Sequence, residues 1–339
     1  MTSYYAKSTS VNPANTITLR EKLKQWLMTS LALLGINKLT RLVTANKPKI
    51  IMFHKVYSDG KADPYSDFIN EGLFEALIIH CKKHFQFYTL GELDAYKQEF
   101  GRYPKHAVVL TFDDGFQSFY HLAFPLLKKH HIKSSLFVCP GLIDKDTTIW
   151  PELIFDAYEK SALAIKHSEL GSLIEELKLL SSEQRQQKIS ELVCKNYQYE
   201  EEQADMNRAL INWPQLREIH SSGLVEVGSH SLTHPILSQE SQEEVNAQMR
   251  LSKERIEAEL SNKVVSFCYP NGQSDDYRET ELIGLKKCAY KTAVTAEFGL
   301  VNDAANPLLL PRFGGDFTNL QQAKKYIDGV EYCQRKLLS

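Results

Sequence analysis

Cysteine is scarce in this chain and is never paired at short spacing. The 339 residues include six cysteines, and no two of them form a CxxC pair. Close cysteine pairs are typical of structural zinc sites, and small disulfide-rich proteins carry far more cysteine per residue. The sequence therefore argues against both classes, and we expect cysteines within apolar runs to be buried free thiols.

An excess of basic residues is also lacking. The chain has 40 Lys and Arg residues against 42 Asp and Glu residues, which gives a formal net charge of −2. A protein that follows a phosphate backbone normally carries a basic excess or a basic stripe. We therefore expect no nucleic acid partner. The hydrophobic share of 43% is that of a soluble globular protein.

Long apolar runs are missing near the start of the chain. Residues 1–18 are polar and do not resemble a secretory signal. The first apolar run, residues 26–35, follows a basic segment and is too short to span a bilayer. A helix over residues 20–35 would either pack on its own domain or lie on a membrane surface. We expect a cytoplasmic protein, with peripheral contact at the inner face of the membrane as an open alternative.

Short apolar segments alternate with helical patterns from residue 49 onward. The clearest strand is residues 106–112, a β-branched run that ends in Asp-Asp-Gly. Helical periodicity covers residues 68–85 and 119–130. The other strand candidates are residues 49–53, 134–138, 226–230, 264–269 and 290–295. This alternation predicts an α/β fold with a mostly parallel sheet, either open or closed into a barrel.

Residues 168–207 differ from their surroundings in composition. They are rich in Glu, Gln, Lys and Leu and lack proline. Because a structureless connection of this length would be unusual, we predict a helical insertion over about residues 150–212. The chain then divides into an N-terminal helical extension (1–46), the α/β domain that holds the insertion (47–320) and a C-terminal helix (321–339).

Adjacent carboxylates end the clearest strand, in residues 111–115 (T-F-D-D-G). Carboxylates at the mouth of a hydrophobic strand are costly unless they are paired, hydrated or metal-bound. Since neighbouring side chains point in different directions, one carboxylate can bind a cation while the other stays free as a base. Asp-Asp-Gly alone is often only a turn, but its place after a buried strand favours a site.

Two histidines follow a later strand, in residues 228–235 (G-S-H-S-L-T-H-P). His230 and His234 are four apart, a spacing that can present both imidazoles to one zinc ion. Two histidines and one aspartate form a three-ligand set with room for water, which is typical of catalytic zinc sites. A third polar strand end, residues 267–272 (F-C-Y-P-N-G), is in isolation only a turn, but it would form another wall of the same mouth.

Residues 111–115 and 229–235 together resemble the polysaccharide deacetylase family, the NodB-homology carbohydrate esterases. Residues 52–56 (M-F-H-K-V), 267–272 and 310–312 (L-P-R) are similar to elements of one subgroup of that family. Two motifs in this order and separation, each at a predicted strand end, make the resemblance specific. It implies a distorted (β/α)7 barrel of the NodB-homology type, with a helical insertion and a mononuclear metal site.

The resemblance also implies roles for four residues. Asp114, His230 and His234 would be ligands of one divalent metal ion, for which we expect zinc, and Asp113 would be the general base. A bound Zn²⁺ lowers the pKa of its water towards about 7, so a modest base completes hydroxide formation.

Two departures from the family pattern concern the general acid and the group that orients the base. The Leu-x-His element that supplies the acid in many members reads Leu-Pro-Arg312, and Cys268 stands where an arginine is often found. We expect Arg312 to contact Asp113 in place of that arginine and to keep it ionised. His54 is the candidate general acid, and its alternative role is that of a structural strand-end histidine.

The resemblance, together with these residues, implies a metal-dependent hydrolase that removes an N-acetyl group from an amino sugar of a glycan or a lipid-linked saccharide. Tyr269, Pro270 and Asn271 would bind the sugar. One alternative is an N-deformylase of a lipid-linked amino sugar, with the same machinery. The other is a catalytically inactive carbohydrate-binding protein, which the two departures favour and the complete set of carboxylates and histidines argues against.

Overall fold

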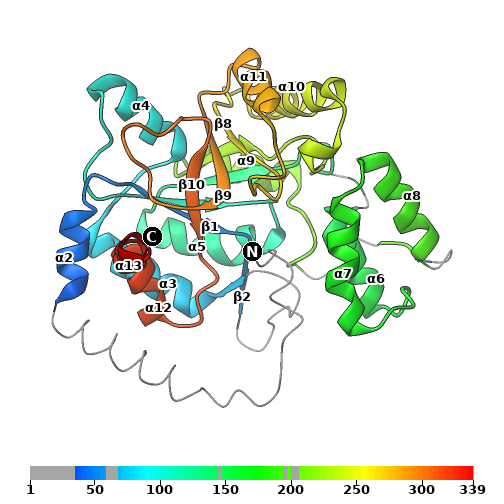
Figure 1. Cartoon of the computed structure of the whole chain (residues 1–339), viewed down its shortest axis with the longest axis horizontal. Helices are drawn as coiled ribbons and strands as arrows, with labels where there is room; N and C mark the ends of the chain where they lie inside the picture. Colours follow the sequence, from blue (N-terminus) through cyan, green and yellow to red (C-terminus); the bar gives the residue numbers. More distant parts are fainter. Residues whose placement is uncertain are drawn as a thin grey trace.

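The computed structural model describes residues 35–58, 68–143, 145, 147–193, 197–199 and 206–338. Seven parallel strands close into a barrel, because β1 pairs with both β10 and β5 (Figure 1). In order around the ring they are β1 (Lys49–Phe53), β5 (Ala107–Phe112), β6 (Ser134–Val138), β7 (Val225–Ser229), β8 (Ser266–Cys268), β9 (Thr292–Phe298) and β10 (Leu310–Gly314). The predicted (β/α)7 barrel is therefore confirmed.

Helices and short strands surround this ring. The short strands are β2 (Lys55–Tyr57), β3 (Phe68–Asn70) and β4 (Gln86–Phe87). The helices outside the insertion are α2 (Ile36–Val43), α3 (Glu71–His84), α4 (Leu90–Phe100), η2 (Phe119–Ala123), α5 (Phe124–His130), α9 (Trp213–Ser221), η4 (Leu237–Gln239), α10 (Gln242–Leu260), α11 (Glu279–Lys287), α12 (Leu320–Ile327) and α13 (Val330–Leu338). The helix predicted at residue 68 begins later, because Asn70 caps α3 by accepting a hydrogen bond from the Leu73 amide.

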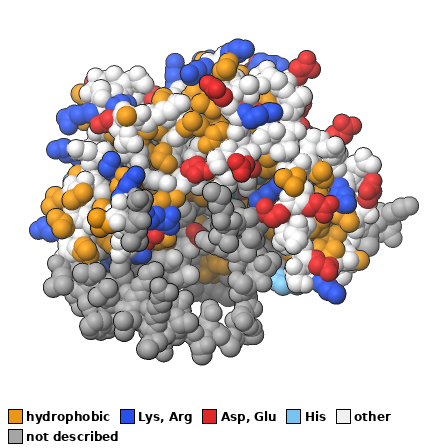
Figure 2. Space-filling view, in the orientation of Figure 1, with side chains coloured by type: hydrophobic (Ala, Val, Ile, Leu, Met, Phe, Trp, Pro, Cys, Tyr) orange, Lys and Arg blue, Asp and Glu red, His pale blue; other side chains and the backbone are white. Residues whose placement is uncertain are grey.

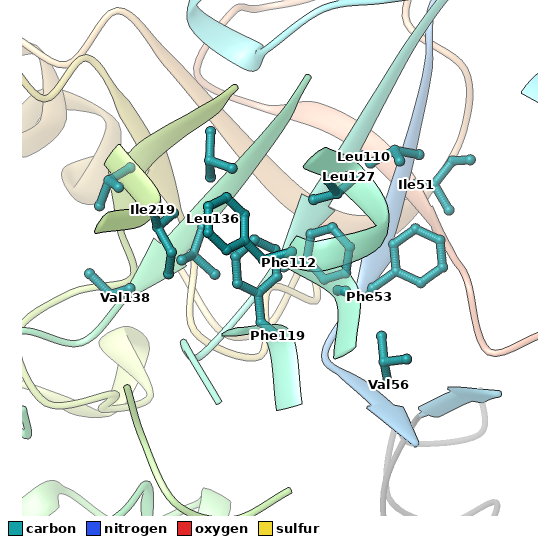
Figure 3. Close-up of a cluster of buried hydrophobic side chains, with 14 of the residues drawn as sticks. Ile51, Phe53, Val56, Leu110, Phe112, Phe119, Leu127, Leu136, Val138 and Ile219 are labelled. Atoms are coloured by element: carbon teal, nitrogen blue, oxygen red, sulfur yellow. The ribbon is translucent and has the colours of Figure 1, made fainter. Parts of the chain in front are cut away.

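The strand period of two gives the barrel one apolar core outside its sheet and another inside it. Alternate side chains face outward and pack against the helices, as Ile51, Phe53, Leu110 and Phe112 do in Figure 3. The intervening side chains fill the barrel: Ile50, Val109, Phe137, Cys268, Val294 and Leu310. Because residues on both faces are buried, the strands read as continuous apolar runs, which is why the sequence revealed them.

A helical insertion lies between β6 and α9, as predicted. It comprises α6 (Trp150–Glu159), α7 (His167–Lys178) and α8 (Ser182–Leu192), drawn in green at the right of Figure 1. These helices share an apolar cluster separate from the barrel cores. The insertion therefore has its own small core and is joined to the barrel by polar contacts described below.

The ends of the chain differ in part from the prediction. Of the proposed membrane-facing segment, residues 20–35, only Gly35 is described, so that contact stays a prediction. The next helix, α2, exposes Leu39, Leu42 and Val43, where Figure 2 shows apolar side chains at the left edge. The C-terminal part forms two helices, α12 and α13, separated by Gly329 at φ 84°. Within the described part of the chain, no helix combines the length and apolarity needed to cross a bilayer.

Candidate metal and catalytic site

Polar side chains continue the inward-facing rows at the carboxyl ends of the strands. His54 directly follows β1 and continues the alternation that begins at the inward-facing Ile50, and Asp113 directly follows β5 and continues that of Val109. Arg312 lies two residues after the inward-facing Leu310 of β10. The alternation that fills the barrel with apolar groups therefore also directs these polar groups into its mouth.

Asp114, His230 and His234 come together at this mouth. Oδ1 of Asp114 lies 3.3 Å from Nε2 of His230 and 3.4 Å from Nε2 of His234. All three side chains are buried. Two ligand atoms bound to one tetrahedral zinc ion at about 2.0–2.1 Å lie about 3.3 Å apart. The spacing of the three atoms thus fits a single ion.

The hydrogen bonds around these side chains also fit a metal. Nδ1 of His230 lies 2.8 Å from the carbonyl oxygen of Cys268, which can only accept, so this nitrogen carries the proton. Nε2 is then free to bind a metal, with its ring oriented by the carbonyl. Oδ1 of Asp114 is buried and forms no hydrogen bond to any described residue. A buried carboxylate oxygen in that state is costly, and a cation would satisfy it.

The charge states of His234 and Asp114 favour the same interpretation. At His230 burial alone would lower the pKa, but the contacts with Cys268 and Asp114 outweigh burial and raise it above its ordinary value, so a metal would displace a proton from this ring. Burial lowers the pKa of His234 to about 3, so its imidazole is neutral at pH 7 and keeps a lone pair for a metal. Burial alone would raise the pKa of Asp114, but the neighbouring imidazoles, His230 first among them, outweigh burial and hold it below its usual range. A neutral imidazole and an ionised carboxylate are the forms that bind zinc.

The backbone adopts the left-handed region at two of the three ligand positions. Asp114 has φ 71° and His234 has φ 61°. Gly115 follows at φ 76°, where an added Cβ would lie 2.9 Å from Cγ1 of Val138. Left-handed non-glycine residues are uncommon and concentrate at functional sites.

One residue that supports the second histidine was missed in the sequence. Oε1 of Gln248 in α10 accepts hydrogen bonds from the backbone amides of Leu232 (2.9 Å) and Thr233 (3.0 Å). Its Nε2 donates to the hydroxyl of Thr233. Gln248 is buried and fixes the loop between His230 and His234. Nothing in its spacing distinguishes it from other glutamines of a long helix.

We predict that His234→Ala lowers zinc affinity at least tenfold. One of three protein ligands is lost, and changes to the residues that only hydrogen-bond to ligands already cost about 10- to 100-fold. Zinc titration with a competing chelator measures this, and Gln248→Ala should show a smaller loss. Unchanged zinc affinity in His234→Ala would remove this residue from the site.

Asp113 is held by Arg312, as the sequence predicted. Nη1 of Arg312 donates to Oδ1 of Asp113 and Nη2 donates to Oδ2, both at 2.8 Å. Arg312 also donates to the hydroxyl of Thr111 (3.0 Å) and the carbonyl of Thr295 (2.8 Å). Both partners of this bidentate pair are buried. The geometry fixes the orientation of the carboxylate.

Arg312 determines the charge of this carboxylate. Burial would raise the pKa of Asp113, but the charge and hydrogen bonds of Arg312 outweigh burial and hold the pKa below its ordinary value. Sγ of Cys268 lies 3.2 Å from Nη2 of Arg312. The small thiol at position 268 therefore leaves the space that the guanidinium of β10 occupies.

His54 faces the same mouth. Its Nε2 lies 3.8 Å from Oδ2 of Asp113, beyond hydrogen-bonding distance, and 16% of its side chain is exposed. Burial lowers the pKa of His54, and the negative charges of Asp114 and Asp113 offset this only in part. The ring is thus neutral in this arrangement and lies within reach of the proposed base.

The third motif departs from the prediction. The ring of Tyr269 is buried beside Tyr277, and its hydroxyl donates to the carbonyl of Leu308 at 3.1 Å. The prediction that Tyr269 lines the sugar pocket is wrong. Its side chain faces outward from the barrel and therefore packs into the layer of helices. Pro270 is also buried, and the amide of Asn271 donates to Asp276. The role of Asn271 in binding sugar stays a prediction.

A family model described as polysaccharide deacetylase matches residues 100–292, more than half of the chain and a range that includes all four proposed metal and base residues. The chain belongs to the polysaccharide deacetylase family. The resemblance noted in the sequence is confirmed by this match. In this family member the guanidinium that binds Asp113 comes from β10, and the thiol of Cys268 lies beside it.

Curated relatives match a limited part of this family member. A poly-β-1,6-N-acetyl-D-glucosamine N-deacetylase of Staphylococcus epidermidis is 34% identical over 108 residues, which covers 27% of this chain and 36% of the relative. The enzyme of the same name from Staphylococcus aureus is 34% identical over 79 residues, covering 23% and 27%. The alignments therefore span about a third or less of the relatives they match.

Solved structures share the fold. IcaB from Ammonifex degensii superposes with a TM-score of 0.58 at 17% identity, covering 84% of this chain and 97% of that chain. The deacetylase PplD of Streptococcus pyogenes, solved in complex with acetate, gives 0.54 at 22% identity, covering 79% and 92%. At these identities the likeness concerns the barrel alone.

Proposed function

We propose that this protein is a metal-dependent hydrolase that removes N-acetyl groups from an amino-sugar polymer. One observation carries the proposal. A possible cation site of three residues lies at the mouth of the barrel, beside a second carboxylate, Asp113, whose orientation is fixed by Arg312. The names of the Staphylococcus relatives support a polymer of N-acetylglucosamine as the substrate class.

The two adjacent aspartates divide the work. Asp114, His230 and His234 would hold the ion, which when bound polarises the amide carbonyl and acidifies water. Asp113 then accepts the proton of the attacking water, because Arg312 keeps its carboxylate ionised and correctly oriented. The bidentate pair and a weak hydrogen bond from the Cys268 thiol to Oδ2 (3.4 Å) occupy three lone pairs of Asp113 and leave one for that proton.

His54 supplies the route by which the proton reaches the leaving amine. A neutral His54 cannot donate first, but it can receive the proton that Asp113 has taken from water. A closure of less than about 1 Å would bring Nε2, now 3.8 Å away, within hydrogen-bonding distance of Oδ2. The imidazolium then protonates the amine, and both residues return to their starting states.

We predict that His54→Gln reduces kcat about 10²-fold, since general acid catalysis typically contributes at least that much. Zinc content should stay at the wild-type value, because His54 is not one of the proposed ligands. Steady-state kinetics with metal analysis tests this. A variant with wild-type kcat would leave His54 a structural residue and the general acid unassigned.

The same arrangement argues against an inactive binding protein. Such a protein would have no need for a guanidinium that keeps Asp113 charged in a buried position, and Arg312 fills the space left by the thiol at position 268. The absence of the usual arginine is therefore compensated within the barrel. A protein without catalytic function would not require Arg312 to take the place of the arginine that Cys268 replaces.

Release of amine from defined saccharides tests the proposal. The purified protein would be incubated with poly-β-1,6-N-acetylglucosamine oligomers, with their N-formylated counterparts and with a lipid-linked N-acetylated saccharide. Metal content is measured on the same sample, and Asp113→Asn is the matched control. We expect acetate and free amine from the acetylated oligomers. Binding without turnover in zinc-loaded protein would instead support the inactive alternative.

A further inference from the structure

The helical insertion is attached to the catalytic strand ends and not only to the outside of the barrel. Its returning segment, residues 206–211, runs beside the loop that follows Asp113 and Asp114. The amide of Ile211 donates to the carbonyl of Gly115 (2.9 Å), and the amide of Gln117 donates to the carbonyl of Ala209 (2.8 Å). Phe116 and Leu210 form an antiparallel bridge between these hydrogen bonds.

A buried ion pair attaches the first helix of the insertion to the neighbouring strand end. Nζ of Lys55, the residue after His54, lies 2.8 Å from Oε2 of Glu152 in α6. Both side chains are buried. The ammonium group also lies 4.6 Å from the ring centroid of Phe116. Lys55 therefore contacts the insertion and the loop after the two aspartates at once.

Glu152 also connects the two ends of the insertion. Nε of Arg208, in the returning segment, lies 3.7 Å from the Oε2 atom that contacts Lys55. Arg208 extends further to Asp156 at 3.7 Å and to Glu159 at 2.8 Å. One buried carboxylate thus lies between a cation from the barrel and a cation from the insertion.

Stability alone does not account for this pair. Desolvation offsets much of the attraction in a buried ion pair, and apolar side chains of similar volume often stabilise as well or better. An ion pair does, however, fix a direction. Consecutive residues of an extended chain point to opposite sides. Holding Lys55 outward against Glu152 therefore holds His54 inward, 3.8 Å from Asp113.

We propose that Glu152 is a positioning residue for His54. The helical insertion, which carries Glu152, thereby contributes to the geometry of the catalytic site. The proposal rests on the proposed function, because it assigns Glu152 to the proton route through His54. The proposal also explains why the ion pair of Lys55 and Glu152 lies at this place, where the insertion contacts the residue that follows His54.

The first test compares two substitutions on the same helix. Glu152→Gln removes the charge that holds Lys55, and Glu159→Gln removes a charge of the same network at a half-exposed position, 44% exposed, which does not touch Lys55. We expect Glu152→Gln to lower kcat about 10- to 100-fold with KM and zinc content little changed, as misplacement of about 1 Å can do. Glu159→Gln should keep nearly full activity. Equal kcat values for the two variants would overturn the proposal.

A double variant covers the outcome in which Glu152→Gln does not fold. Lys55→Met with Glu152→Leu replaces the pair by apolar groups of similar volume and should fold. We expect the double variant to bind zinc. Its kcat should be as low as that of Glu152→Gln, because no ion pair fixes the direction of residue 55. Wild-type kcat in this folded variant would show that packing, not the pair, positions His54.

Hydrogen exchange separates this proposal from the proposed function. Exchange measured by mass spectrometry should increase over residues 53–57 in Glu152→Gln and stay unchanged over α12, irrespective of substrate. If the wild-type protein releases no acetate but exchange increases as expected, the proposed function fails and the positioning contact stands. Unchanged exchange over residues 53–57 in a folded variant would refute the contact itself.

Discussion

Replacing Asp113 by asparagine is expected to reduce kcat about 10²- to 10⁴-fold, the range that a general base contributes. The amide has the same shape as the carboxylate but cannot accept the proton of the attacking water. Zinc binding should be retained, because the proposed ligands are Asp114 and the two histidines. Turnover with metal analysis on one sample of protein measures both quantities.

The control for this variant is its fold, because Asp113 is buried against Arg312. Asparagine can still accept one hydrogen bond from the guanidinium, but the ion pair is lost. The melting temperature should therefore be recorded, and activity measured well below it. A folded, zinc-loaded Asp113→Asn with near-normal kcat would mean that the metal alone activates the water.

Replacing Arg312 by alanine is expected to lower both stability and activity. The substitution leaves the buried carboxylate of Asp113 without its partner, and breaking a buried pair in this way costs about 3–5 kcal/mol. Urea unfolding of the variant and of the wild type measures this difference. Arg312→Lys restores the charge without the bidentate geometry and should recover only part of the loss. An unfolding free energy within 1 kcal/mol of wild type in Arg312→Ala would contradict the pair's assigned role.

The pH dependence of the rate provides an independent test of the Arg312→Ala variant. Arg312 lowers the pKa of Asp113, so its removal raises that pKa and the base stays protonated to higher pH. The acidic limb of the pH–rate profile should therefore move to higher pH in Arg312→Ala. The matched substitution Arg335→Ala, on the exposed side of α13, should leave the limb in place.

The strands and the polar residues at their ends could be predicted from local rules, whereas the closure of the sheet into a barrel was implied by the family resemblance. Strands buried on both faces read as apolar runs, and the polar residues that end them mark the carboxyl edge. Even the long-range pair of Arg312 and Asp113 was predictable, since one guanidinium was missing from the pattern and one was available at a strand end.

Other contacts depend on how elements distant in the sequence pack together, and the hydrophobic periodicity of the sequence does not predict that packing. Gln248 and Glu152 lie on helices whose patterns predict only an amphipathic face, so their contacts with the loops of the mouth were missed. Tyr269 was predicted on the wrong side, because the sequence alone did not show whether its strand began one residue earlier or later. A shift by one residue exchanges the two faces of a strand.

The left-handed backbone at Asp114 and His234 restricts which residues these positions accept, before any chemistry is considered. Aspartate, asparagine and histidine tolerate this conformation better than most side chains, and β-branched residues tolerate it poorly. The residue types that bind zinc and the residue types that this backbone permits therefore overlap. Glutamate, although a zinc ligand elsewhere, lacks that conformational tolerance, and asparagine has the tolerance without the charge. Evolution of this site towards another metal is thus confined by the backbone to a narrow choice of donors.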